Sequence, residues 1–273
     1  EGVVGLGHGA AYDRERVRHL RHRPRIRPRH GPMTVRHAFL RACTSPALRP
    51  VRRLVGAALG GRLRRVRVLS GRARGARLEL DLAGEKAYWA GTYEPEVQDL
   101  LAGTLTPGAV FYDVGGHIGF FSVLAARLGA QVFTFELLPE NARRIRRNAA
   151  LNGVEIEVVE EAAWDSSEGV SLVAGSSSSE WRAAPAGTSG SVSLDEFAAL
   201  HPPPDVIKID VEGAEARVLA GAARLLAERR PIVICEVHGR EERELVRQLL
   251  RDYDVETLGS DWRLVARLSP VAP

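Results

Sequence analysis

From residue 107 onward, short apolar runs alternate with longer stretches in which apolar residues recur every three or four positions. The first pattern predicts buried strands and the second predicts amphipathic helices. We predict strands at 110–113, 132–136, 155–160, 206–210 and 232–236, helices at 119–128, 139–151, 214–228 and 241–251, and a closing hairpin at 253–258 and 262–267. This alternation favours a mostly parallel sheet covered on both faces. The predicted fold class is α/β, a doubly wound seven-stranded sheet with a closing antiparallel hairpin and a short amino-terminal appendage.

Three segments depart from this alternation. Residues 63–82 alternate apolar with arginine or small residues, which predicts one or two strands, and residues 34–63 resemble short helices interrupted by prolines and glycines. Residues 163–192 are rich in serine and glycine, and we expect an irregular hairpin near the site. We therefore divide the chain into an extension at 1–32, an appendage at 33–90 and a main domain at 91–270.

The positive charge of the chain lies at its front. Residues 1–78 hold 20 arginines and three acidic residues, a net charge of +17, whereas the remainder holds 18 basic and 31 acidic residues, a net charge of −13. Clustered arginine suits nucleic acid or an anionic membrane. Aromatic side chains that would stack on bases are scarce between Tyr12 and Phe39. We therefore expect no nucleic-acid partner.

The extension at 1–32 is rich in arginine, histidine and proline and lacks the apolar content to fold. We interpret it as a disordered or mis-assigned segment ahead of Met33, and we expect it to be dispensable. The chain has no run of about 18 apolar residues and no signal-peptide pattern, which predicts a cytoplasmic protein without a membrane span. Cys43 and Cys235 are too few for a metal cage or a disulfide framework.

A glycine-rich turn follows the first strand of the main domain. The sequence Phe111-Tyr-Asp-Val-Gly-Gly-His-Ile-Gly-Phe-Phe-Ser122 ends a strand at Asp113 and places three glycines before an apolar helix. Such glycines let a ligand approach the backbone, but their spacing differs from the Gly-x-Gly-x-x-Gly of NAD-binding turns. Asp113 would repel a pyrophosphate and suits a cationic ligand. Glu136, which ends the next strand, can accept hydrogen bonds from both ribose hydroxyls. Together they predict a ligand that contains adenosine.

Acidic residues and a histidine follow the later strands. Asp210, Glu212 and Glu215 come within six residues, and Glu236 and His238 end the next strand on one face. Doubly wound sheets bind ligands at this edge. Glu215 is interpreted equally well as an acid that stabilises the start of a helix. An imidazole titrates near neutral pH, so we expect His238 or Asp210, ahead of Glu212, to accept a hydroxyl proton.

Several stretches of the chain, in order, resemble the FkbM family of class I methyltransferases. They are Gly91-Thr-Tyr-Glu-Pro95, Asp113-Val-Gly-Gly-His-Ile-Gly-Phe-Phe-Ser122, Phe135-Glu136 with Pro139-Glu-Asn141, Asn148 with Leu151-Asn-Gly153, Ala162-Ala-Trp-Asp165, Ser193-Leu-Asp195, Lys208-Ile-Asp-Val-Glu-Gly-Ala-Glu215 and Glu236-Val-His238. The resemblance covers residues 78–268 and is most specific at residues 208–215. It implies a Rossmann-like fold and S-adenosylmethionine as the cofactor.

The resemblance also implies roles for individual residues. The methionine end of the cofactor would lie at the strand-end acids and the turn, the ribose at Glu136, and the adenine at the turn of Glu161 and Ala162. The residues implied at the methionine end are Asp113, Gly115 and Gly119, with Tyr93 and Glu94 closing over the cofactor from the amino-terminal side. Gly116, His117 and Asp210 are further expected cofactor-binding residues. Gly116-His117 stands where the family usually has Ala-Asn, and Leu137-Leu138 separates Glu136 from Pro139. Both departures change the expected shape of the pocket, but neither removes a charged side chain that would bind the cofactor.

Known members of the family mostly methylate oxygens in natural products and carbohydrates. The resemblance therefore implies an O-methyltransferase with a small-molecule or glycan acceptor, and this chemistry requires no metal. Two alternatives stay open, which are a non-catalytic nucleotide-binding module and an NAD-linked oxidoreductase. The acids beyond the fourth strand argue against the first, and the glycine spacing argues against the second.

Overall fold

The computed structural model describes residues 62–174, 181–185 and 187–268. The predicted extension at 1–32 and the helices predicted at 34–63 lie outside the described residues, apart from the last two positions of the latter. Among the helices that are described, none combines the length and the apolar character needed to cross a bilayer.

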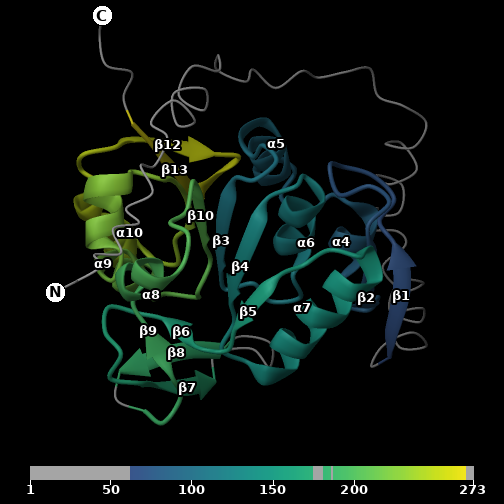
Figure 1. Cartoon of the computed structure of the whole chain (residues 1–273), viewed down its shortest axis with the longest axis horizontal. Coiled ribbons are helices and arrows are strands. Elements are labelled where there is room, and N and C mark those ends of the chain that lie inside the picture. Colours follow the sequence, from purple (N-terminus) through teal and green to yellow (C-terminus); the bar gives the residue numbers. More distant parts are fainter. Residues whose placement is uncertain (1–61, 175–180, 186, 269–273) are drawn as a thin grey trace, which may run out of the picture. The chain divides into compact units, whose positions relative to one another are not determined.

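A seven-stranded sheet forms the centre of the described chain (Figure 1). Its strands are β3 (Val110–Val114), β4 (Gln131–Phe135), β5 (Glu157–Val159), β10 (Val206–Ile209), β11 (Ile232–Glu236), β12 (Asp254–Leu258) and β13 (Ser260–Arg267). They follow the order β12-β13-β11-β10-β3-β4-β5. The five strands β11, β10, β3, β4 and β5 pair in parallel, and β13 runs antiparallel between β11 and β12. The predicted mostly parallel seven-stranded sheet with a closing hairpin is confirmed.

Helices cover both faces of the sheet. One face carries α5 (Pro95–Thr104), α6 (Phe120–Arg127) and, beside α6, α7 (Pro139–Asn152), and the other carries α8 (Leu194–Leu200), α9 (Glu215–Ala220) and α10 (Arg240–Leu249). Neighbouring strand residues point to opposite faces. Phe111 and Tyr112 of β3 therefore belong to two different buried cores. Because both faces are covered, the strands are almost continuously apolar.

The single helix predicted at 214–228 is wrong. Two shorter elements replace it, α9 and the π-helical turn η2 (Leu225–Arg229). At Gly221, between them, a Cβ atom would overlap the carbonyl oxygen of Trp164, so the chain passes too close to its neighbour for any other residue. The Asp195 carboxylate then accepts hydrogen bonds at 2.8 Å from two backbone N–H groups at the start of the second element. The apolar period alone does not reveal this break.

Three of the described helices lie outside the predicted elements: α5, α8 and the short α4 (Lys86–Ala90). A capping box begins α8, because the Ser193 hydroxyl accepts a hydrogen bond from the Glu196 N–H and the Glu196 carboxylate accepts one from the Ser193 N–H, both at 3.2 Å. The residue types and their spacing carry this signal in the sequence. A search for apolar periodicity over ten or more residues passes over a helix of this length.

The described part of the amino-terminal segment shares a core with the sheet. Its elements are β1 (Leu63–Arg67), β2 (Arg77–Asp81) and α4 (Lys86–Ala90). β1 and β2 pair antiparallel, which confirms the strands predicted at 63–82. Leu78 and Leu80 are fully buried and pack in the same core as Phe111. Residues on both sides of position 90 therefore bury their apolar side chains together.

A small accessory region lies between β5 and α8. It consists of β6 (Ala162–Ala163), β7 (Val170–Ala174), β8 (Trp181–Pro185) and β9 (Ser191–Val192). β7 and β8 pair antiparallel, which confirms the hairpin predicted within 163–192. Val170 is fully buried and packs with Val211 and Ala214, the residues that follow β10. The base of the hairpin therefore lies beside the carboxyl end of that strand.

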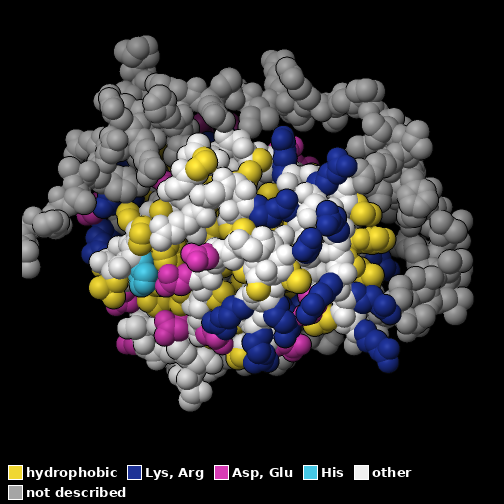
Figure 2. All heavy atoms as spheres, turned by 45° about the vertical axis from the view of Figure 1, so that its right-hand side comes forward, with side chains coloured by type: hydrophobic (Ala, Val, Ile, Leu, Met, Phe, Trp, Pro, Cys, Tyr) yellow, Lys and Arg dark blue, Asp and Glu magenta, His cyan; other side chains and the backbone are white. Residues whose placement is uncertain are grey.

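Arginine side chains gather on one face of the described chain, over β1, β2 and α7 (Figure 2). The exposed arginines of these elements are Arg64, Arg65, Arg67, Arg77, Arg143, Arg146 and Arg147. Glu79 partly neutralises them, because its carboxylate lies 3.7 Å from Arg65 and 2.8 Å from Arg147. Exposed arginines of the described part of the basic front thus share one surface with exposed arginines of α7.

Candidate active site

The carboxyl ends of the central parallel strands meet at one edge of the sheet (Figure 1). Asp113 lies at this end of β3, Glu136 directly after β4, Asp210 directly after β10 and Glu236 at the end of β11. Lys208 of β10 pairs in register with Asp113. Ligands of doubly wound sheets bind at this edge. The four acids found by sequence therefore share the position at which a ligand is expected.

The glycine turn after β3 is packed tightly between two strands. Gly115 has a left-handed backbone with φ of 82°, and a Cβ there would overlap the carbonyl oxygen of Asp210. A Cβ at Gly116 would overlap the side chain of Thr134 on β4. The sequence motif suggested that these glycines leave room for a ligand, but the structure gives a different reason. Both are required so that the turn can approach its own neighbouring strands.

Asp113 is buried at the start of this turn. Its Oδ2 accepts a hydrogen bond from the Ser122 hydroxyl, which accepts one from Thr134 at 2.9 Å. Its Oδ1 has no partner among the described residues. Burial raises the pKa of Asp113, and the positive charge of Lys208 offsets this only in part. An unpaired buried acceptor costs about 1–3 kcal/mol, so a ligand that carries N–H groups or positive charge would be stabilised here.

Glu136 meets the glycine turn from β4. Its Oε2 accepts a hydrogen bond from the His117 N–H and its Oε1 accepts one from the Leu138 N–H, both at 2.8 Å. Burial raises the pKa of Glu136 to about 7, because the group lies away from water and the two backbone donors and the side chain of Asn141 compensate only partly. Each carboxylate oxygen has a second lone pair, one of which faces Asn141. Glu136 can therefore accept a further hydrogen bond from a ligand, and a second one if the ligand replaces Asn141.

A buried lysine lies between the strands that carry these acids. Lys208 Nζ is 3.1 Å from Asp210 Oδ2 and 5.0 Å from the centre of the Phe121 ring. Although burial works against it, the carboxylates of Asp210, Asp113 and Glu94 raise the pKa of Lys208. Burial alone would raise the pKa of Asp210, but Lys208 lowers it. Sequence analysis missed this lysine, although a charged residue in the apolar run of β10 was a usable signal.

Arg263 joins two further acids at this edge. Its Nη2 lies 3.0 Å from Glu94 Oε1 and 2.6 Å from Glu236 Oε2. Burial raises the pKa of Glu94 to about 7 despite the nearby Lys208 and Arg263. The second carboxylate oxygen of Glu94 has no partner among the described residues. In the sequence Arg263 looks like one more exposed arginine of a hairpin, and only the pairing of β13 with β11 places it here.

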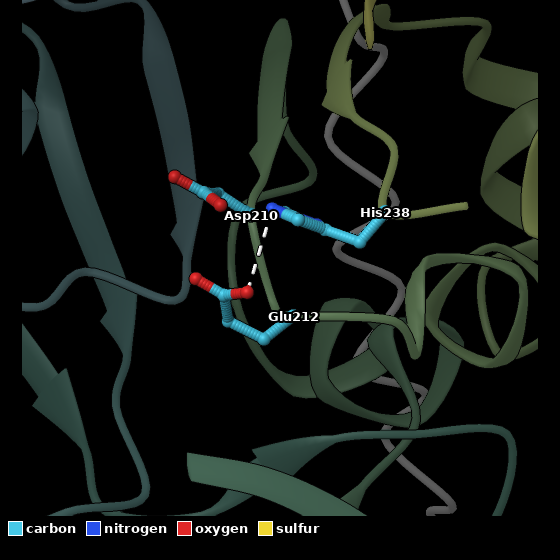
Figure 3. Close-up of side chains that lie close together, drawn as sticks. All are labelled: Asp210, Glu212 and His238. Atoms are coloured by element: carbon cyan, nitrogen blue, oxygen red, sulfur yellow. Dashed lines mark ion pairs between the residues drawn. The ribbon is translucent and has the colours of Figure 1, made fainter. Parts of the chain in front are cut away.

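His238 lies among three acidic side chains. Its Nδ1 donates a hydrogen bond to Glu215 Oε1 at 2.8 Å, and its Nε2 lies 3.5 Å from Glu212 Oε2. Figure 3 shows Asp210 and Glu212 extending from the segment after β10 and His238 from the segment after β11. One atom of each lies within 4.8 Å of the others. The hydrogen bond to Glu215 raises the pKa of His238 to about 9, so the ligand-free imidazole is protonated at neutral pH.

Glu215 has a larger role at the site than its position in the sequence indicated. It is the first residue of α9, in agreement with its interpretation as an acid at the start of a helix. Its side chain is nevertheless fully buried, and the same oxygen that binds His238 accepts a hydrogen bond from the Gly213 N–H at 2.9 Å. Its other oxygen has no partner among the described residues. Glu215 therefore fixes the orientation of the imidazole.

Aromatic side chains border the glycine turn on the amino-terminal side. The ring centres of Tyr88 and Tyr93 are 4.2 Å apart, and the Tyr88 hydroxyl lies 3.4 Å from His117 Nδ1. The predicted residues Tyr93 and Glu94 thus lie near the turn that holds His117. Tyr88 was not predicted, because it belongs to a short helix with no apolar period.

One buried amide fixes the loop that carries Tyr93. The Nε2 of Gln98 donates hydrogen bonds to the carbonyl oxygens of Gly91 at 3.2 Å and Tyr93 at 2.6 Å. Its Oε1 accepts hydrogen bonds from the backbone N–H groups of Arg72 at 2.9 Å and Ala73 at 3.4 Å. Both donors and the acceptor of this side chain are used, so two loops are tied together.

The predicted adenine turn lies farther along the same edge. Glu161 and Ala162 follow β5, which pairs with β4. Ala162 packs near Leu137, the residue after Glu136, and its N–H donates to the Gly190 carbonyl at 3.0 Å. The strand order places this turn beyond Glu136, on the side away from Asp210.

Just over half of the chain, residues 113–257, matches the family model described as the methyltransferase FkbM domain. Methyltransferase FkbM from Methylobacillus flagellatus KT, a solved structure, is 19% identical with a TM-score of 0.44, and the match covers 58% of this chain and 43% of that one. Precorrin-6y C5,15-methyltransferase from Geobacter metallireducens GS-15 is 17% identical with a TM-score of 0.44, and the match covers 64% of this chain and 88% of that one. The match thus spans less than half the length of the Methylobacillus protein. No curated protein matches the chain.

Proposed function

The chain belongs to the FkbM methyltransferase family, whose methyl donor is S-adenosylmethionine, and from this premise we propose that it methylates a hydroxyl oxygen of a small molecule or glycan. The sulfonium of the donor supplies an electrophilic methyl carbon, so that a C–O bond forms while the C–S bond breaks and its electron pair stays on sulfur. The residues of the chain have two tasks, which are to position the reactants and to accept the hydroxyl proton.

The unpartnered oxygen of Asp113 carries this proposal. A buried carboxylate oxygen at a strand-to-helix turn fits the ammonium of a methionine group, which would donate the missing charge-assisted hydrogen bond. We propose that this group is bound at Asp113 and by the turn that follows it. The turn residues are Gly115, Gly116, His117 and Gly119, and the proposed contacts on the facing segments are Tyr93, Glu94 and Asp210. All of them belong to segments that meet at one edge of the sheet.

Glu136 is the proposed ligand of the ribose. Both of its oxygens are held in place by backbone N–H groups, and the two ribose hydroxyls would take the remaining lone pairs, one of them in place of the Asn141 side chain. Glu161 and Ala162 lie beyond Glu136 on the same edge, which supports their proposed place beside the adenine. Along the neighbouring strands β3, β4 and β5, the proposed contacts thus follow one another from the methionine end through the ribose to the adenine.

Asp210, Glu212 and His238 are the proposed catalytic residues. Their proximity supports a common role at the hydroxyl of the acceptor. Because the pKa of His238 is raised to about 9 by Glu215, the imidazole must first lose its Nε2 proton before it can accept another. His238→Ala should lower turnover by about 10²–10⁴-fold, the contribution typical of a general base, and leave the affinity for S-adenosylhomocysteine nearly unchanged.

The distribution of charge supports a neutral, hydroxyl-bearing acceptor. Acidic side chains outnumber Lys208 and Arg263 at the carboxyl edge, so a phosphate backbone would be repelled there. A group of exposed arginines lies instead over β1, β2 and α7 (Figure 2). We therefore propose a small molecule or glycan and not a nucleic acid.

Thermal denaturation with different cofactors tests the binding half of the proposal. S-adenosylhomocysteine should raise the melting temperature of the full chain, and NAD should leave it unchanged. Asp113→Asn should abolish the shift, whereas Asp99→Asn, which changes an exposed acid paired with Arg72, should retain it. A shift with NAD alone would establish the oxidoreductase alternative, and no shift with either ligand would overturn the proposal.

Incubation with radiolabelled S-adenosylmethionine tests the reaction. Candidate acceptors are hydroxylated glycans and polyketide or peptide intermediates, with an RNA oligonucleotide as the comparison. Mass spectrometry of the product should locate the methyl group on oxygen. Label on nitrogen, or label on RNA alone, would contradict the proposed acceptor class, and cofactor binding without transfer to any acceptor would favour the non-catalytic module.

A further inference from the structure

The cluster of Asp210, Glu212 and His238 combines two carboxylates with one imidazole (Figure 3). One possible ligand atom from each residue lies within 4.8 Å of the others. Two of the residues come from the segment after β10 and the third from the segment after β11, so parallel strand pairing holds the cluster together. Imidazole nitrogen and carboxylate oxygen are common ligands of divalent transition-metal ions.

The orientation of His238 is that of a metal ligand. Glu215 accepts the Nδ1–H at 2.8 Å, which directs Nε2 toward the carboxylate of Glu212 at 3.5 Å. Histidines that bind metals almost always donate their other N–H to a carboxylate, a backbone carbonyl or water. The fully buried carboxylate of Glu215 meets this requirement, because it leaves the Nε2 side of the ring facing the two other acids.

Unpartnered carboxylate oxygens provide a separate indication that a cation is bound at this edge. Four buried side-chain atoms lack a hydrogen-bond partner among the described residues, and three of them are carboxylate oxygens of Glu94, Asp113 and Glu215. Asp113 and Glu94 are proposed contacts of the cofactor, which accounts for two of these oxygens. The third belongs to Glu215, the carboxylate that binds His238, and the cofactor does not account for it.

We propose that Asp210, Glu212 and His238 bind one divalent transition-metal ion, for which Mn²⁺ is the probe. The imidazole ligand favours such an ion over Ca²⁺ and Mg²⁺, which prefer sites made of oxygen atoms. The neighbouring cluster of Glu94, Asp210 and Glu236 is a poorer site, because it has no imidazole and because Arg263 already pairs with both Glu94 and Glu236. Asp210, which pairs with Lys208, belongs to both clusters. Sequence analysis predicted no metal, since methyl transfer does not require one.

The ion would give the acceptor side of the proposed methyltransferase a defined chemical preference. With the ion bound, His238 would coordinate it through Nε2 and would no longer accept the hydroxyl proton itself. The ion would instead lower the pKa of a hydroxyl that it binds, so that water can take the proton, and it would fix the direction of that hydroxyl. A substrate with two neighbouring oxygens, such as a vicinal diol of a sugar, fits this arrangement because it can occupy two coordination positions. This part of the inference rests on the proposed function, whereas binding of the ion itself does not.

Titration with Mn²⁺ tests the site directly. The full chain is treated with a chelator, exchanged into metal-free buffer and titrated by calorimetry, with electron paramagnetic resonance of the free ion as a second measurement. We expect one saturable site. Asp210→Asn, Glu212→Gln and His238→Gln should each weaken Mn²⁺ binding by at least about tenfold, because changing a residue that merely hydrogen-bonds a metal ligand already lowers metal affinity by about 10–100-fold. Glu236→Gln should bind Mn²⁺ as the wild type does.

Spin-echo modulation identifies the ligands. The bound Mn²⁺ should show modulation from a directly coordinated histidine nitrogen, and this signal should vanish in His238→Gln. Each variant is also heated in chelator without ligand, and a cooperative unfolding transition like that of the wild type shows that it is folded. Absence of Mn²⁺ binding, a nitrogen signal that persists in His238→Gln, or loss of binding in Glu236→Gln but not in His238→Gln would overturn the assignment. A chain that binds Mn²⁺ but not S-adenosylhomocysteine would instead contradict the proposed function alone.

Discussion

The two halves of the site hold their acids in different ways. In the first half, Asp113 and Glu136 are held by a hydroxyl and by backbone N–H groups, without an ion pair among the described residues. In the second half, Asp210 and His238 are held by charged side chains. Backbone donors are fixed by the fold, whereas side-chain ion pairs can exchange partners. We therefore propose that the first half is shaped for one constant ligand and that the second half can adapt to different acceptors.

Gly115→Ala should have the largest effect, because it acts where the two halves touch. The left-handed backbone costs an alanine about 1–2 kcal/mol. Overlap of the new methyl group with the Asp210 carbonyl adds about 1–3 kcal/mol. We expect the free energy of unfolding to fall by about 2–5 kcal/mol in urea denaturation, with loss of S-adenosylhomocysteine binding.

Gly153→Ala is the matched control for this substitution. Gly153 also has a left-handed backbone, with φ of 63°, but no atom lies within 4 Å of an added Cβ. The control should therefore lose only about 1–2 kcal/mol, the cost of the left-handed backbone. Equal losses in the two variants would mean that packing of the turn against β10 contributes nothing.

Asp210→Asn tests the charged character of the second half. It leaves the buried Lys208 without its nearest partner, and breaking a buried pair typically costs about 3–5 kcal/mol. Because Asp113 and Glu94 also face this lysine, we expect a smaller loss of about 2 kcal/mol in the free energy of unfolding at pH 7. Asp99→Asn, which breaks a half-exposed pair with Arg72, should cost less than about 0.5 kcal/mol. Similar losses would contradict the difference between the halves.

Glu136→Ala tests the first half by ligand affinity. The variant removes two charge-assisted hydrogen bonds proposed for the ribose, worth about 1.5–3 kcal/mol. Calorimetry should therefore show at least about tenfold weaker binding of S-adenosylhomocysteine. Glu140→Ala, an exposed acid in the first turn of α7, should bind normally. Unchanged affinity in Glu136→Ala would remove this residue from the site.

The affinity for S-adenosylhomocysteine should also depend on pH through Glu136. With a pKa of about 7, the carboxylate fraction rises from about a tenth at pH 6 to about nine tenths at pH 8. Only the carboxylate accepts from both ribose hydroxyls, so affinity should rise up to about tenfold over this window. The pKa of the folded state is raised above its ordinary value of 4.5, so the contribution of this group to stability is present below pH 4.5 and is lost as pH rises through 7.

The effect of pH on ligand binding is therefore opposite in sign to its effect on the ligand-free fold. Calorimetry at pH 6, 7 and 8 measures how the affinity for S-adenosylhomocysteine changes with pH, and urea denaturation of the free chain measures how the free energy of unfolding changes with pH. Glu136→Gln should remove the contribution of this group from both pH dependences. A wild-type affinity that stays constant from pH 6 to pH 8 would show that ionisation of Glu136 is not linked to binding.

The sheet was predictable because its strands are buried on both faces, which leaves apolar runs that are easy to recognise. The break at Gly221 was not predictable, because it depends on the Trp164 carbonyl more than 50 residues earlier in the chain. The capping box at Ser193 was readable but was not used. Local patterns thus identify elements, while contacts between distant segments decide where some of them end.

The acids of the site were predictable because strand ends in a doubly wound sheet meet at one edge. Their partners were not. Lys208 stands out as a charged residue in an apolar strand, but the sequence does not show which acids it faces. Arg263 reaches the site only through the pairing of an antiparallel strand. Glu215 has the position of an ordinary acid at the start of a helix. The pKa of His238 depends on Glu215, so its protonation at neutral pH could not be read from the motif.

The fully bonded amide of Gln98 has a consequence for the kinetics of ligand binding. It orders the loop of Tyr93 and Glu94 before any ligand arrives. Ordering a flexible backbone costs about 1–2 kcal/mol per residue, and a ligand that meets a preformed loop avoids this cost. Association should therefore follow a single exponential whose rate constant grows linearly with ligand concentration, without a slow phase for loop closure.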